Sequence, residues 1–97
     1  MRIEISETAL ADLDLITAYI EDAAGLGTAD DYEARIRVKI ATLMNFPNRG
    51  TDRSSVGRGY RSITFEGRLI ILDHVGRDVV TIARVVAGKR DLSALTL

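Results

Sequence analysis

Beyond the first five residues, the spacing of the apolar residues changes once along this chain, and the change divides it into a helical part and a β part. Up to Pro47 the apolar residues recur every three or four positions, which is the repeat of an amphipathic helix. After Gly59 they form short runs rich in β-branched residues, separated by dipeptides that contain glycine. Such runs are typical of strands joined by tight turns. Together the two patterns predict an α+β domain in which helices pack on a sheet.

These patterns predict the element order β-α-α-β-β-β. Ser6 is the expected N-cap of the first helix, which Gly25 and Gly27 are expected to end. Thr28 is the expected cap of a second helix, which stops before Pro47. We expect the helices to form an antiparallel hairpin on an antiparallel sheet. The predicted elements are a strand at residues 2–5, helices at 7–24 and 28–46, and strands at 60–65, 68–75 and 78–86.

Length and composition fit one small domain over residues 1–97. The hydrophobic fraction is 46% and the chain has no cysteine, which excludes disulfides, thiolate metal sites and a cysteine nucleophile. No apolar run approaches the ~20 residues of a membrane span, and the first residues do not resemble a secretory signal. We therefore expect a cytoplasmic protein without a cofactor.

The charges are distributed unevenly, although the net charge is only −1. Residues 1–31 contain eight acidic residues and one basic residue, whereas residues 32–97 contain six acidic and twelve basic residues. A basic half of this kind favours an acidic partner. The alternative is a solvated surface whose charges segregate without a partner.

Two groups of side chains are candidates for binding a partner. Leu15 and Tyr19 lie four residues apart and off the main apolar stripe of the first helix, so they are either a second buried face or a patch that a partner covers. The arginines of the second half are the other group, because guanidinium groups bind carboxylates with two hydrogen bonds. These arginines are Arg53, Arg58, Arg61 and Arg84.

Several short motifs, in their order, resemble the RelE/ParE toxin superfamily and its ParE branch in particular. The resemblance covers nearly the whole chain, and no single motif is specific. At Ala87 the chain departs from many ParE-like sequences, which have a histidine there. The motifs are Ala11-Asp12-Leu13-Asp14-Leu15-Ile16-Thr17-Ala18-Tyr19-Ile20, Phe46-Pro47-Asn48-Arg49-Gly50, Gly59-Tyr60-Arg61, Arg68-Leu69-Ile70-Ile71-Leu72 and Val85-Val86-Ala87-Gly88-Lys89-Arg90-Asp91-Leu92.

The resemblance implies the toxin of a type II toxin–antitoxin module, which inhibits DNA gyrase and is neutralised in a hetero-oligomer by a ParD-like antitoxin. The acidic, flexible C-terminal segment of the antitoxin would bind the toxin, and DNA would be reached only through the antitoxin. Lys89, Arg90 and Asp91 are the expected gyrase contacts. The expected antitoxin contacts are Leu15, Tyr19, Arg53, Arg58, Arg61 and Arg84.

Two alternatives remain open at this point. A RelE-like endonuclease that cleaves mRNA on the ribosome needs a general acid–base group, and related toxins resemble one another in using a Tyr or His near the C-terminus. No Tyr or His follows His74, so we predict a non-catalytic inhibitor. We interpret His74 as structural, and with one His and no Cys the chain predicts no metal site. The other alternative is a non-toxic relic that only binds its antitoxin.

Overall fold

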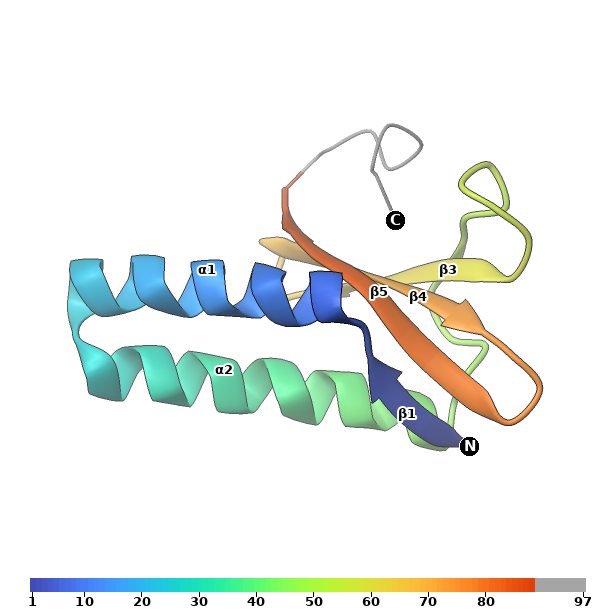
Figure 1. The fold of residues 1–97 in the computed structure, drawn as a ribbon, viewed down its shortest axis with the longest axis horizontal. Helices are drawn as coiled ribbons and strands as arrows, with labels where there is room; N and C mark the ends of the chain where they lie inside the picture. The colour runs from blue at the N-terminus through green and yellow to red at the C-terminus, as the bar shows by residue number, and fades with distance from the viewer. Residues whose placement is uncertain (89–97) are drawn as a thin grey trace.

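The computed structural model describes residues 1–88 and shows a two-helix hairpin packed on a five-stranded sheet (Figure 1). The predicted α+β class and order of elements are confirmed, with two short additions, η1 and β2. The elements are β1 (Arg2–Ile5), α1 (Glu7–Ala24), α2 (Leu26–Ala41), the 3-10 helix η1 (Thr42–Met44), β2 (Thr51–Asp52), β3 (Tyr60–Phe65), β4 (Leu69–Val75) and β5 (Val79–Ala87).

Helix α1 begins where the sequence predicts it. The Ser6 hydroxyl oxygen accepts a hydrogen bond from the Ala9 N–H at 3.1 Å and so satisfies one of the free amides of the first turn. The same hydroxyl donates to the Ala83 carbonyl at 3.1 Å, which joins the helix start to β5. One serine therefore both caps α1 and fixes its position on the sheet.

The link between the helices is shorter than predicted. Gly25 alone reverses the chain with a φ of 93°, a conformation that favours glycine, and α2 begins at Leu26. The prediction that Thr28 caps α2 is wrong, because the Gly25 carbonyl already accepts the Ala29 N–H at 3.1 Å and leaves Thr28 inside the helix. Gly27 likewise lies within α2, which ends at Ala41, earlier than predicted.

The sheet has the strand order β1-β5-β4-β3-β2. Strands β3, β4 and β5 form the predicted antiparallel meander, and β1 adds to it by pairing in parallel with β5. Glu66 and Gly67 join β3 to β4 with φ values of 49° and 68°, and the Arg68 N–H donates to the Phe65 carbonyl at 3.0 Å. Two positive φ values make this the hairpin turn whose twist matches that of the strands. β4 is thus the central strand, as its apolar run predicts.

The helices cover one face of the sheet and bury the main core against it. This core joins Leu13 of α1 and Ile36 of α2 to Ile71 of β4 and Ile82 of β5, all at most 1% exposed. On the opposite face a smaller cluster forms around Leu72 and Val86. Within residues 1–88, neither helix contributes a residue to that second cluster. Among the described residues, no helix combines the length and the apolar character of a membrane span.

Candidate functional site

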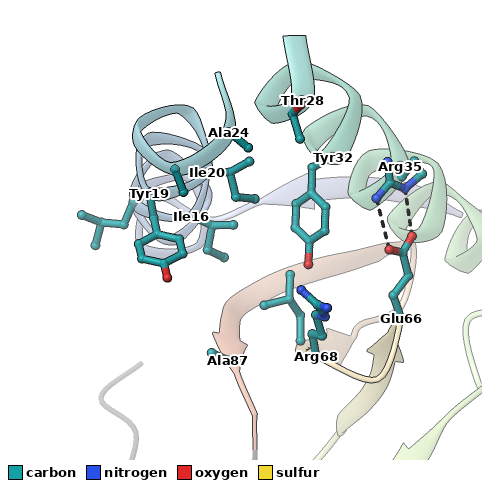
Figure 2. A pocket seen from close by; sticks show the side chains of 13 residues that line it. Ile16, Tyr19, Ile20, Ala24, Thr28, Tyr32, Arg35, Glu66, Arg68 and Ala87 are labelled. Carbon is teal, nitrogen blue, oxygen red and sulfur yellow. Dashed lines mark hydrogen bonds and ion pairs between the residues drawn. The ribbon is translucent and has the colours of Figure 1, made fainter. Parts of the chain in front are cut away.

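A groove of about 860 Å³ lies between the helical hairpin and the neighbouring end of the sheet (Figure 2). It forms because the hairpin extends beyond the sheet, so that the last turns of α1 and the first turns of α2 have no strand beneath them (Figure 1). The groove is lined by Leu15, Ile16, Tyr19, Ile20, Ala23 and Ala24 of α1, by Thr28, Tyr32 and Arg35 of α2, and by Glu66, Arg68, Leu69 and Ala87 of the sheet.

Leu15 and Tyr19 line this groove from α1. Their exposed fractions are 72% and 75%, which are the two largest among the exposed large apolar residues of the described chain. Two large side chains one helical turn apart and open to water are typical of a surface that a partner covers. The structure therefore excludes a second buried face at these positions, whereas their contact with an antitoxin stays a prediction.

The opposite wall of the groove is charged. Arg35 donates to Glu66 twice, from Nε to Oε2 at 2.9 Å and from Nη2 to Oε1 at 3.2 Å. The hydrogen bond from Arg35 holds the pKa of Glu66 below its usual range, and the charges of Arg35 and Arg68 act in the same direction. Sequence reasoning missed all three side chains, although the Glu66-Gly67 turn was predicted. Two arginines and one glutamate leave this wall with an excess positive charge.

Tyr32 forms the floor between the apolar and charged walls. Its ring meets that of Phe65 edge-on, with 5.4 Å between ring centres, and the Arg35 guanidinium carbon lies 5.2 Å from the centre of the Tyr32 ring. In Figure 2 the Tyr32 side chain extends from α2 towards Arg68. An aromatic residue between an apolar wall and two guanidinium groups suits a ligand segment that is apolar on one side and acidic on the other.

Arg84 already has an intramolecular partner. Its Nε and Nη2 donate to the two carboxylate oxygens of Asp12 at 2.8 and 3.0 Å, and both side chains are largely buried. The Val85 N–H, which lies beyond the end of β1, also donates to Asp12, at 2.9 Å. The hydrogen bonds that Arg84 donates to Asp12 raise the pKa of Arg84. This arginine thus joins β5 to α1, and its contact with an antitoxin stays a prediction.

The other three predicted arginines lie at the far end of β3 from the groove. Arg53 Nε donates to the Ser62 hydroxyl at 2.8 Å, and Arg61 Nη2 donates to the Gly50 carbonyl at 3.0 Å, whereas Arg58 is exposed. The six residues of β3 separate this basic end from Glu66, about 20 Å along the strand. The structure thus divides the predicted antitoxin contacts among three places: the groove, the Arg84–Asp12 pair and this basic end.

Asp73 is a buried acid that sequence reasoning missed. It lies in the centre of the sheet beside Arg61 and Ile82, is 0% exposed, and neither carboxylate oxygen accepts a hydrogen bond from the described residues. Burial raises the pKa of this carboxyl to about 7, against a smaller opposing effect of the Arg61 charge. A lone acid within the apolar run of β4 was the signal in the sequence.

His74 lies on the open face of the sheet. Its ring packs edge-on against Tyr60, with 5.0 Å between ring centres, at a shallow cleft of about 240 Å³. Ser6, Thr8 and Thr81 contribute hydroxyl groups to the cleft, but within residues 1–88 no arginine or lysine lines it. Arginine and lysine side chains are among the groups that stabilise the charge of a transferring phosphate. The packing against Tyr60 agrees with the interpretation of His74 as structural.

Two similarities to known proteins agree with this fold. The fold is similar to a solved structure described as "Chromosomal ParDE TA system from P. aeruginosa", with a TM-score of 0.80 and 24% identity over 92% of this chain and 97% of that one. None of the curated proteins matches the sequence. Residues 3–92 match the family model described as "ParE toxin of type II toxin-antitoxin system, parDE". The chain belongs to this family and is a ParE-type toxin.

Lys89, Arg90 and Asp91, the predicted gyrase contacts, lie outside the residues that the structure describes. The groove therefore has a described geometry, whereas its occupant and the gyrase contacts both stay predictions from the sequence.

Proposed function

We propose that this toxin inhibits DNA gyrase in the cytoplasm and is held inactive by a ParD-like antitoxin whose acidic C-terminal segment lies in the groove. The observation that carries the antitoxin part is the pairing of an exposed apolar wall, formed by Leu15 and Tyr19, with a positively charged wall that includes Arg68. A segment of alternating apolar and acidic side chains complements both walls at once.

The gyrase part rests on membership of the ParE family and on the sequence, in which no Tyr or His follows His74. The cleft at His74 offers an imidazole and hydroxyl groups but no cation among the described residues. We therefore propose a non-catalytic inhibitor, in which Lys89, Arg90 and Asp91 contact gyrase.

A supercoiling assay with purified gyrase tests the proposal directly. The toxin alone is expected to stop supercoiling, and addition of the small protein encoded by the adjacent gene is expected to restore it. Intact supercoiling in the presence of a folded toxin would contradict gyrase as the target. Expression without the antitoxin separates the remaining alternatives, since a non-toxic relic does not arrest growth and a ribonuclease cleaves mRNA on ribosomes.

A further inference from the structure

The Arg35–Glu66 ion pair stands between two apolar depressions of the surface. One is the groove already described, and the other, of about 470 Å³, lies between α2 and β3. Both include Arg35 and Glu66 in their lining, and the second is otherwise formed largely by Val38, Phe65 and neighbouring small side chains. Val38 is 68% exposed, so this second depression is open to water as the groove is. The pair therefore divides one long apolar surface into two parts.

Each depression also has a cation without a carboxylate of its own. Arg68 lines the first and Lys39 lines the second, and within residues 1–88 neither forms an ion pair. Since Arg35 and Glu66 neutralise each other, the surface as a whole has a positive excess. An occupant that extends along both depressions is therefore expected to combine apolar side chains with carboxylates.

The pair itself is accessible to an occupant. The side chains of Arg35 and Glu66 are 52% and 43% exposed, and ion pairs of this exposure contribute little to stability because water competes for both groups. The guanidinium lies on the Tyr32 ring, which keeps it at the surface. A carboxylate from outside that reached Arg35 would find the same two donors that Glu66 uses.

The backbone of Glu66 points to a role for its side chain. Its φ of 49° is the only positive value at a non-glycine residue in the described chain. Asparagine and aspartate are the usual side-chain-bearing residues at this position of such a turn. Glutamate offers the turn no such advantage, but its longer side chain reaches Arg35. An asparagine here would keep the turn and remove the ion pair, which makes a useful variant.

We propose that a carboxylate of the antitoxin's acidic segment displaces Glu66 from Arg35, and that the apolar side chains on either side of this carboxylate fill the two depressions. Glu66 then acts as an internal competitor that occupies Arg35 until the cognate segment arrives. This inference rests on the proposed function, since it assigns the occupant to the antitoxin. It adds a specificity requirement, namely a carboxylate placed between two apolar anchors.

Replacing each residue of the ion pair in turn tests the exchange, because the two substitutions are expected to change the antitoxin affinity in opposite directions. The probe is the full-length protein encoded by the adjacent gene, titrated into the toxin by calorimetry. We expect Glu66→Asn to tighten binding about threefold, because it removes a competitor held by an exposed pair. We expect Arg35→Gln to weaken binding about tenfold, because it removes the charge-assisted hydrogen bonds to the incoming carboxylate. A purely structural pair would give both variants the same sign.

The Arg37–Glu33 pair supplies the matched control. It lies on the same helix, has a comparable exposure and is joined at 3.0 Å, but neither residue lines the two depressions. Glu33→Gln and Arg37→Gln are expected to leave the affinity unchanged. Equal changes in these controls, with tighter binding by Glu33→Gln and weaker binding by Arg37→Gln, would assign the effects to general surface charge and overturn the exchange.

The remaining outcomes separate this inference from the proposed function. No binding to the wild-type toxin would contradict the proposed function itself. Binding to the wild type with equal effects of Glu66→Asn and Arg35→Gln would overturn only the exchange. Sedimentation of the toxin alone is expected to show a monomer, and a dimer that Arg35→Gln dissociates would place a second copy of this chain on the surface instead. Each Asp or Glu of the antitoxin can also be replaced by its amide. The carboxylate that exchanges with Glu66 should be the one whose amide variant binds wild-type toxin and Glu66→Asn with equal affinity.

Discussion

Replacing Asp73 with asparagine is expected to change how the stability of the toxin depends on pH. The folded protein raises the pKa of this carboxyl from 3.8 to about 7, first because burial disfavours the charged form. The folded state therefore keeps the proton up to about pH 7, whereas the unfolded chain releases it near pH 4. Between these values, each pH unit lowers the free energy of unfolding by about 1.4 kcal/mol.

The size of the effect follows from this shift. A difference of about three pKa units corresponds to roughly 4 kcal/mol, absent below pH 4 and complete above pH 7. The side chain in Asp73→Asn cannot ionise, so the free energy of unfolding of this variant does not fall in this way as the pH rises. Its free energy of unfolding, relative to wild type, should therefore rise by roughly 4 kcal/mol between pH 4 and 7 and change little from pH 7 to 8. Because the two proteins differ only at residue 73, the difference between their free energies of unfolding reports the titration of this one carboxyl.

Urea unfolding at half-unit pH intervals measures this difference, and Asp22→Asn controls for the loss of one exposed negative charge. Should Asp73→Asn fail to fold, the carboxyl carbon of Asp73 can be followed by NMR in the wild-type toxin. A stability difference that stays constant from pH 4 to 8, or a carboxyl that titrates near pH 4, would refute the reasoning. Either result would mean that water or the charge of Arg61 stabilises the ionised form of Asp73 better than its 0% exposure indicates.

Three further predictions concern the scaffold and the two binding surfaces. Asp12→Asn should lower the free energy of unfolding by about 2–4 kcal/mol, because it breaks a largely buried pair, and chemical denaturation measures it. Tyr19→Ala should weaken antitoxin binding by about 1–2 kcal/mol without loss of thermal stability. Leu26 is exposed outside the groove, so Leu26→Ala should leave antitoxin binding unchanged. Deleting residues 89–97 should abolish gyrase inhibition in the supercoiling assay but preserve antitoxin binding; equal loss of both would contradict a separate gyrase contact.

Local signals in the sequence predicted the helices and the meander. Ser6 and Gly25 set the bounds of α1 because a cap and a positive φ are decided within a few residues. The same locality explains the error at Thr28. Its capping preference is real, but a hydrogen bond from the Ala29 N–H to the Gly25 carbonyl had already begun the helix. Local preference does not say which of two neighbouring caps the chain uses.

The parts that were not predicted depend on residues far apart in the chain. The parallel pairing of β1 with β5, the Asp12–Arg84 pair and the Arg35–Glu66 pair join positions that are 31 or more residues apart. Nothing in the spacing of a single sequence identifies such partners. The exposure of Leu15 and Tyr19 was accessible to prediction, because helical periodicity alone places them off the buried stripe. The sequence thus indicated two apolar residues that line the groove, Leu15 and Tyr19, but neither the groove itself nor its charged wall.

The two long-range ion pairs differ in a way that suits a protein that must be held inactive and then released. Asp12 and Arg84 are largely buried, so separating them would leave an uncompensated charge in the interior, and the position of α1 on β5 is fixed. Arg35 and Glu66 are about half exposed, so water or another carboxylate can replace either one at little cost. Both pairs position a helix against the sheet, but only the second borders the groove. In the proposed exchange, a carboxylate of the antitoxin replaces Glu66 at the groove, while the buried Asp12–Arg84 pair holds the scaffold unchanged.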